Sequence, residues 1–470
     1  MTHTHTILAG NLRIRVGIGE SGLALLGIAD GKTGRKFFSG KRALFSLVTR
    51  EILNPEKKET TDSLSGWEQV SAAKCGNVHL FTLQKPGLTV ILTAEAKQNE
   101  VVWNVKLDSA SKDKTLYECD YPVLPFASHR GVKVFFPYGC GELYKAEKPF
   151  TTRQNYPSYG ASMQYMAVYH EKTGRGLYYG LHDPDPAYKK LEYGSDGKEG
   201  HLKAVMPLRD IDRAENGQTL AGELVWKLYD GDWYDAALFY KEFFLKKASW
   251  MPVMEDGKRA DTPDELRENP FWWRKRMLWD EKYADELIRA DKDLGLTKPS
   301  PVHLYDWFQI PYDTNYPHYF PAKDTFLTGT KRLQKYGIKV MPYINGRLWD
   351  THDRGKEDWQ FTPLAKPWCT KQAGGKPFLE SYPTSNIDLA IMCPSSALWQ
   401  EKMTEIVKTL FEEFGVDAVY MDQIGAAQAY PCEDKRHNHR AGGGSWWIES
   451  YRDLLGHIHR ITPAGGFLTT

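Results

Sequence analysis

Three aspartates stand at or just beyond the ends of predicted strands in the second half of the chain. Asp422 closes the apolar run Ala418–Met421 in VDAVYMDQIG, and Asp306 and Asp350 close the segments PVHLY and IKVMPYINGRLW. An ionised carboxylate is costly to bury without partners. Retaining glycosidases need two carboxyl groups about 5–5.5 Å apart, one as nucleophile and one as proton donor. The three positions therefore predict a shared acidic site, with structural ion pairs as the alternative.

Aromatic residues gather around the same strand ends. The chain contains 15 Trp, 26 Tyr and 20 Phe. Aromatic rings have an apolar face and, in Tyr and Trp, a polar handle, so they suit sugar rings as well as protein cores. The aromatic residues near the strand ends are Tyr305, Trp307, Tyr343, Trp349, Trp446 and Trp447. They predict a carbohydrate-binding surface, and the alternative is that they pack the interior and the rim of the domain.

A possible metal motif lies further along the chain. Cys432, His437 and His439 form C-x4-H-x-H, and these residue types bind zinc. The spacing is not that of a standard structural zinc site, no fourth ligand is evident, and the six cysteines contain no CxxC pair. The sequence therefore predicts reduced cysteines, no metal and no cofactor. The two histidines are then either sugar ligands or loop residues without a role.

The segment GGGSWW is a flexible loop before a helix. A phosphate-binding loop would carry a lysine after its glycines. Here Trp446 and Trp447 follow instead, so nucleotide binding is not predicted.

Two rhythms divide the chain into a multidomain β plus α/β fold. Residues 1–245 contain many short alternating or aromatic strands, which predict an antiparallel β-sandwich that ends in a helix capped by Asp232 and packed on the next domain. Residues 246–270 are polar and rich in proline, as in a linker. Residues 271–470 alternate helices with apolar strands, which predicts a TIM-type (β/α)8 barrel. In such a barrel the site lies at the carboxyl ends of the strands.

Four blocks carry a resemblance to a known family: HLYDWFQIPYDTNYPHYFPAK, GIKVMPYINGRLWD, VDAVYMDQIG and CEDKRHNHRAGGGSWW. From about residue 155 onward the chain resembles a bacterial family of glycoside-hydrolase-like proteins of unknown specificity, built from an N-terminal β-sandwich and a (β/α)8 barrel. That family is more distantly similar to endo-α-N-acetylgalactosaminidases and to the α-galactosidase and α-glucosidase clans. The resemblance implies that Asp422 is the nucleophile at the end of the fourth barrel strand.

The resemblance and the aromatic pattern together define a predicted substrate site. Its members are Asp306, Trp307, Tyr343, Asn345, Arg347, Trp349, Asp350, His437, His439 and Trp446. In the family, a Glu that follows the strand LTT is the acid/base, whereas this chain ends at Thr470. We therefore expect a barrel truncated at its C-terminal end and a proton donor beyond Thr470. Glu380 and Glu433 are candidates within the chain, although neither ends a predicted strand.

The sequence is compatible with two functions. The first is a retaining glycoside hydrolase, exo- or endo-acting, on a bacterial, plant or host oligosaccharide or polysaccharide. The second is a carbohydrate-binding protein or fragment without catalysis. The sugar, the anomer, the linkage and the oligomeric state are not predicted.

Charge and hydropathy argue against two other classes of partner. Lys and Arg total 61 against 60 Asp and Glu, so the sequence predicts neither nucleic-acid nor membrane binding. It shows no signal peptide and no apolar stretch long enough to span a bilayer. We therefore expect a cytoplasmic protein, or a periplasmic or secreted one if a signal was removed.

Overall fold

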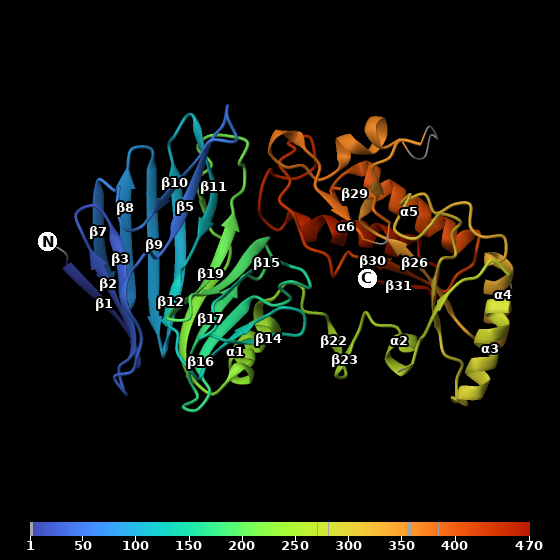
Figure 1. Ribbon diagram of the computed structural model, residues 1–470, viewed down its shortest axis with the longest axis horizontal. Helices are drawn as coiled ribbons and strands as arrows, with labels where there is room; N and C mark the ends of the chain where they lie inside the picture. The colour runs from blue at the N-terminus through green and yellow to red at the C-terminus, as the bar shows by residue number, and fades with distance from the viewer. Residues whose placement is uncertain (1–2, 270, 281, 355–359, 384) are drawn as a thin grey trace. The chain divides into compact units, whose positions relative to one another are not determined.

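The computed structural model describes residues 3–269, 271–280, 282–354, 360–383 and 385–470 (Figure 1). The chain forms two compact units. The first contains Met1–Met251, Gln428–Lys435 and Arg440–Trp446, and the second contains Pro252–Ala427, Arg436–His439 and Trp447–Thr470. Among the described residues, no helix combines the length and the apolar character that crossing a bilayer requires.

The first unit is built from three antiparallel sheets. One sheet has four strands, β1 (His3–Ala9), β2 (Leu12–Ile18), β3 (Leu23–Asp30) and β4 (Lys36–Arg42). The largest runs in the order β14 (Glu142–Lys145), β13 (Val132–Phe136), β16 (Tyr165–His170), β17 (Arg175–His182), β21 (Glu223–Asp230), β10 (Glu100–Ser109), β9 (Leu88–Lys97), β8 (Val78–Lys85) and β7 (Gln69–Cys75), with β20 (Gln218–Thr219) beside β10. The third runs β15 (Phe150–Tyr156), β18 (Lys189–Ser195), β19 (Glu199–Pro207), β11 (Lys114–Asp120), β5 (Ser46–Glu51) and β6 (Lys58–Asp62), with β12 (Leu124–Ala127) beside β19.

These sheets share one apolar core. Alternate residues of β2 and β9 are buried, as expected for strands with one covered face. The core takes Ile14 from the first sheet, Trp103 and Trp226 from the second, and Leu47 and Leu202 from the third. The sequence rhythm thus correctly predicted a layered antiparallel β unit.

Helix α1 (Trp233–Lys247) covers part of the largest sheet. Asp232 begins it as predicted, because its carboxylate accepts a hydrogen bond from the Tyr234 amide at 2.7 Å. The helix lies against the largest sheet of the first unit. It covers β16 and β17, where the Phe243 ring stacks on His182 with 4.5 Å between centroids. Nearly every residue of these two strands is buried, and a strand buried on both faces needs a cover on each.

The segment after α1 contains short elements only. They are a two-stranded hairpin, β22 (Met254–Glu255) with β23 (Lys258–Arg259), and helix α2 (Asp264–Glu268). They fall within the predicted linker.

The second unit contains a five-stranded parallel sheet. Its order is β24 (Trp273–Arg276), β25 (Val302–Tyr305), β26 (Val340–Asn345), β30 (Ala418–Asp422) and β31 (Phe467–Thr469). The order follows the chain, as in a (β/α) barrel, and the strand pairings are parallel. Among the described strands β24 and β31 remain the two edges, so this sheet is not closed into a barrel.

Helices alternate with these strands as predicted. They are α3 (Lys282–Leu294), α4 (Phe326–Tyr336), α5 (Ala397–Glu412) and α6 (Trp446–Ile461). Helices α3 and α4 lie side by side (Figure 1). Gly337 ends α4 with φ 103°, a backbone conformation that glycine adopts without a steric cost.

The predicted strand 338–350 is two strands rather than one. It breaks after Asn345, and β27 (Leu348–Asp350) joins a separate antiparallel sheet with β29 (Asp388–Ile391) and β28 (Leu379–Ser381). The break has a local cause: the Asn345 side-chain oxygen accepts hydrogen bonds from the amides of Arg347 and Leu348 at 2.9 and 3.0 Å. An asparagine that binds its own downstream backbone makes a turn. The remaining elements are a π-helical turn at Phe361–Ala365 and 3-10 turns at Lys366–Trp368 and Ala373–Gly375.

The cap of α1 gives a stability prediction. Asp232→Ala removes the acceptor for the Tyr234 amide and half of a reciprocal pair in which Asp235 binds the Asp232 amide. We expect a loss of about 1 kcal/mol, measured as a lower urea midpoint for the first unit. Lys241→Ala, on the exposed face of the same helix, is the control and should leave the midpoint nearly unchanged. An equal shift in both variants would contradict the capping role.

Candidate active site at the carboxyl edge of the parallel sheet

Two of the three predicted aspartates reach the same edge of the parallel sheet. Asp422 is the last residue of β30, the fourth strand, and Asn345 on β26 lies opposite it. Asp306 follows β25 directly, with φ 56°. Strand β26 separates β25 from β30, so two spacings of about 4.8 Å lie between the strands that carry the two aspartates.

The third aspartate, Asp350, lies in the separate antiparallel sheet. Its side chain is buried, and its oxygens accept hydrogen bonds from the amides of Asn315 (2.7 Å) and His352 (2.9 Å). The His352 ring nitrogen Nδ1 is 3.0 Å from the same carboxylate. These contacts match the structural alternative for this residue, because they commit the carboxylate to holding the backbone.

Asp422 is surrounded by tyrosines. The Tyr420 hydroxyl donates to Asp422 Oδ1 at 3.0 Å, and both side chains point to the same face because they stand two residues apart on one strand. Tyr343 stacks on Tyr305 at 4.9 Å and lies 6.1 Å from Tyr420, measured between ring centroids. Tyr312 lies 5.4 Å from Tyr343.

These tyrosines remain protonated. Burial is the main reason why the pKa values of Tyr420 and Tyr305 lie above the usual value for tyrosine. The negative charge of Asp422 raises both pKa values further. Burial, with the negative charges of Asp313 and Asp422 adding to it, raises the pKa of Tyr312 to about 12. Each tyrosine hydroxyl can therefore both donate and accept a hydrogen bond, as is needed to bind sugar hydroxyls.

A second polar chain runs beside Asp422. The guanidinium of Arg347, which is 0% exposed, donates to Glu380 Oε1 at 2.7 Å. The Tyr382 hydroxyl donates to the other Glu380 oxygen at 3.2 Å, and Gln423 donates to that hydroxyl. Glu380 thus connects to the residue directly after Asp422. Both of its carboxylate oxygens accept hydrogen bonds, so this Glu is arranged as an acceptor.

The other predicted carboxylates also have partners. Asp306 forms an ion pair with Arg276, whose Nη2 lies 3.3 Å from Oδ1. Glu433 lies in the first unit, where Arg50 Nη1 is 2.6 Å from its Oε2. Among the described residues, Asp422 takes part in no such ion pair.

Most of the predicted aromatic ligands are core residues. Trp307 and Trp349 are at most 1% exposed, and the Trp307 indole donates to the Tyr343 carbonyl at 2.8 Å. Trp349 packs against Trp399, and the indole of Trp446, at the start of α6, donates to the Gly442 carbonyl at 3.0 Å. These contacts match the packing alternative rather than an open sugar platform.

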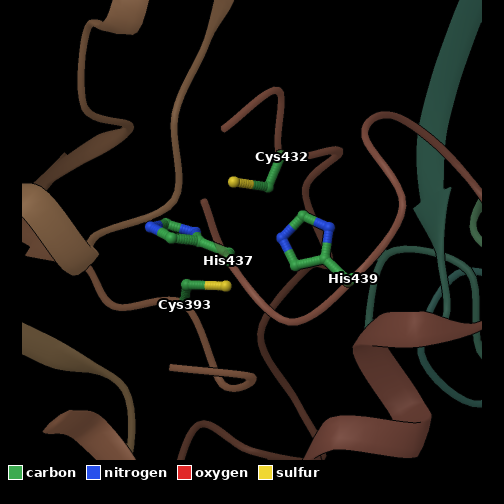
Figure 2. A group of neighbouring side chains, drawn as sticks. All are labelled: Cys393, Cys432, His437 and His439. Atoms are coloured by element: carbon green, nitrogen blue, oxygen red, sulfur yellow. The ribbon is translucent and has the colours of Figure 1, made fainter. Parts of the chain in front are cut away.

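The two predicted histidines lie together with two cysteines. His437 is 4% exposed and its ring is 5.8 Å from that of His439. Cys393 and Cys432 point toward the same point (Figure 2).

Sequence reasoning missed several of these groups. Arg276 and Cys393 meet their partners only through tertiary contacts, so no local spacing marks them. Tyr420 was detectable, because a tyrosine two residues before an aspartate on one strand shares its face.

Comparisons with known proteins assign the chain to a family. A family model described as "Domain of unknown function (DUF6259)" matches residues 218–469, more than half of the chain. The chain belongs to the DUF6259 family.

Two relatives of this DUF6259 chain carry glycosidase names. It is 29% identical over 345 residues to a "Putative glycoside hydrolase" of Bacteroides thetaiotaomicron, a match over 72% of this chain and 49% of that protein. It is 29% identical over 349 residues to "Putative glycoside hydrolase 22789" of Monosiga brevicollis, over 68% of this chain and 29% of that protein. The matched region thus spans half or less of these relatives. The predicted resemblance to a glycoside-hydrolase-like family is confirmed.

Solved structures share the fold. The alpha-N-acetylgalactosaminidase NagBb from Bifidobacterium bifidum, in complex with GalNAc, superposes with a TM-score of 0.72 and 13% identity, over 99% of the DUF6259 chain and 76% of the other chain. The GH36 alpha-galactosidase AgaA from Geobacillus stearothermophilus superposes with a TM-score of 0.50 and 11% identity, over 99% and 72%. At these identities the likeness concerns the fold.

The ion pair of Arg347 gives a prediction. Arg347→Met leaves the Glu380 carboxylate, whose side chain is 21% exposed, without its buried cation, so we expect a loss of about 1–3 kcal/mol, less than for a fully buried pair. We expect a lower urea midpoint for the second unit. The exposed pair Lys246–Glu242 is the control, since Lys246→Met should change stability by less than about 0.5 kcal/mol. A midpoint in Arg347→Met that matches the wild type would show that the pair contributes little.

Two histidines of the second unit, the half-buried His303 and the buried His318, give a pH prediction. Burial lowers the pKa of His303 to about 4 and that of His318 to about 3. The unfolded chain, with an ordinary His pKa near 6.5, then binds more protons than the folded one between about pH 6.5 and pH 4. Stability of the second unit should therefore fall as the pH falls through this window. His303→Gln should make that fall shallower in urea titrations at several pH values, whereas His459→Gln, at an exposed site, should not.

Proposed function

We propose that this chain carries the sugar-binding and nucleophilic part of a retaining glycoside hydrolase site, with Asp422 as the nucleophile. One observation carries the proposal. Asp422 ends the fourth parallel strand and contacts a tyrosine hydroxyl, whereas Asp306, Asp350, Glu380 and Glu433 are bound to cations or backbone amides. A carboxylate can act as a covalent nucleophile, and one whose charge is not neutralised by a cation is the better candidate.

In this mechanism an Asp422 oxygen attacks the anomeric carbon as the glycosidic bond breaks. A carboxylic acid protonates the leaving oxygen, and a glycosyl ester of Asp422 forms. Water, deprotonated by the same second group, then attacks the anomeric carbon and releases Asp422. The tyrosines around Asp422 orient the sugar through their hydroxyls and their rings.

The proton donor has to be another group than the two glutamates named above. Glu380 accepts hydrogen bonds on both oxygens, and Glu433 is paired with Arg50 in the first unit. Asp306 lies two strand spacings from β30 and is paired with Arg276, so we assign it to substrate orientation. In this proposal the donor is a carboxylic acid other than Asp306, Glu380 and Glu433.

We propose galactose-configured α-glycosides as the substrates to test first. The support is the shared fold of an alpha-N-acetylgalactosaminidase and an alpha-galactosidase. The alternative function, carbohydrate binding without hydrolysis, predicts that these sugars bind and are not turned over.

The test is Asp422→Asn in the full-length protein. This variant keeps the shape and removes the nucleophilic charge, so we expect turnover of an aryl α-glycoside to fall by about 10³-fold or more while sugar binding by calorimetry is retained. Labelling by a mechanism-based fluorosugar should also disappear. Asp453→Asn, on the exposed face of α6, is the control and should keep full turnover.

A smaller variant tests the role directly. With Asp422→Gly, azide can enter the vacated space and attack an activated substrate, which restores turnover and gives a glycosyl azide of inverted configuration. Near wild-type turnover in Asp422→Asn, or no azide product from an otherwise folded Asp422→Gly, would show that Asp422 is not the nucleophile.

A further inference from the structure

Four potential metal ligands converge in the loops that follow β29 and β30. Cys393 comes two residues after β29, and Cys432, His437 and His439 belong to the loop between β30 and α6. One ligand atom from each lies within 4.8 Å of all the others (Figure 2). Both cysteines are fully buried and His437 is 4% exposed.

The spacing of these atoms fits a small tetrahedral site. Zinc binds thiolate sulfur at about 2.3 Å and imidazole nitrogen at about 2.0–2.1 Å, which places the corners of a tetrahedron about 3.3–3.8 Å apart. A largest separation of 4.8 Å therefore requires an inward movement of about 1 Å or less. Two sulfurs and two imidazoles are a common donor set for structural zinc.

The surroundings hold the ligands in a binding-competent state. His437 Nε2 lies 3.1 Å from the Pro367 carbonyl, which can only accept, so this hydrogen bond places the ring proton on Nε2 and the metal ligand would be Nδ1. This hydrogen bond from a ligating histidine to a backbone carbonyl is typical of metal centres. The Trp368 ring stacks on His437 at 5.9 Å, and the Ser395 hydroxyl lies 3.1 Å from Cys393 Sγ, where it can donate to a thiolate.

Sugar binding and a disulfide account for the cluster less well. Sugar ligands must reach solvent, and His437 is almost completely buried. A disulfide between Cys393 and Cys432 would engage two of the residues but not the two histidines, and the structure has all six cysteines as thiols.

We propose that Cys393, Cys432, His437 and His439 bind one structural zinc ion. Four protein ligands leave no position for a catalytic water, so this ion would not enter the reaction. Binding displaces the two thiol protons into solvent. The ion links the loop that begins after Asp422 to the end of β29. This inference is independent of the nucleophile assignment.

The first experiment measures metal in the full chain, expressed with zinc in the medium and purified without chelator. Elemental analysis should find close to one zinc per chain, and Cys432→Ser should lower this content by at least about tenfold. Cys75→Ser is the matched control, because Cys75 is exposed and outside the cluster. Zinc near zero in the wild type, or zinc unchanged by Cys432→Ser, would overturn the proposal.

A second measurement needs no variant to fold. Co(II) loaded into the wild-type chain should give the intense visible bands of a tetrahedral site and a thiolate-to-cobalt charge-transfer band, both lost on adding zinc. A thiol-blocking mercurial should release zinc to an indicator dye. Octahedral Co(II) spectra, or a Cys393–Cys432 disulfide in peptide mass spectra of freshly purified protein, would show that the cluster does not bind metal as proposed.

Discussion

The register between β26 and β30 is the constraint on which the candidate site depends. Asp417, just before β30, fixes it: its Oδ2 accepts the Val340 amide at 2.8 Å, and its own amide donates to the Val340 carbonyl at 3.1 Å. At the other end the Gly346 amide donates to the Asp422 carbonyl at 3.0 Å. A slip of one residue would turn every side chain to the opposite face, so these bonds keep Tyr420 and Asp422 among the tyrosines.

The close approach at Gly346 belongs to the same arrangement. A Cβ atom there would lie 2.8 Å from the Ile424 side chain. The chain can therefore turn from β26 toward β27 directly beside the segment that follows Asp422. Asn345 makes that turn, and the turn places Arg347 where it binds Glu380. One local amide interaction thus connects the end of a strand, a buried ion pair and the neighbourhood of Asp422.

The sequence predicted the larger features because they follow from periodicity. Local residue patterns are enough to predict the alternating short strands, the end of α4 at Gly337 and the apolar strand that ends in Asp422. The sequence did not predict that α1 covers β16 and β17, since the need to cover these strands on both faces arises only when the sheet forms. Asp350 was misplaced for a related reason: nothing in IKVMPYINGRLWD distinguishes a continuous strand from two strands divided by the Asn345 turn. The partners of Asp306 and Glu380, and the meeting of Cys393 with the histidines, are long-range and leave no local signal.

Ordering the loop between β30 and α6 costs conformational entropy. Residues 423–445 form this loop without a helix or strand, and fixing the backbone costs roughly 1–2 kcal/mol per residue. Loops of this length inside a compact domain are uncommon unless they are functional. The bonds seen within it, such as the Gly442 amide to the Cys432 carbonyl at 2.8 Å, contribute only about 1 kcal/mol each. A zinc ion held by four side chains would contribute far more, because structural zinc binding releases roughly 10–16 kcal/mol in small peptides.

The loop starts at the residue after Asp422, so an interaction that orders it also limits the conformations open to the end of β30. The zinc proposal and the nucleophile proposal are independent in their tests, but both concern the rigidity of the same short stretch of backbone.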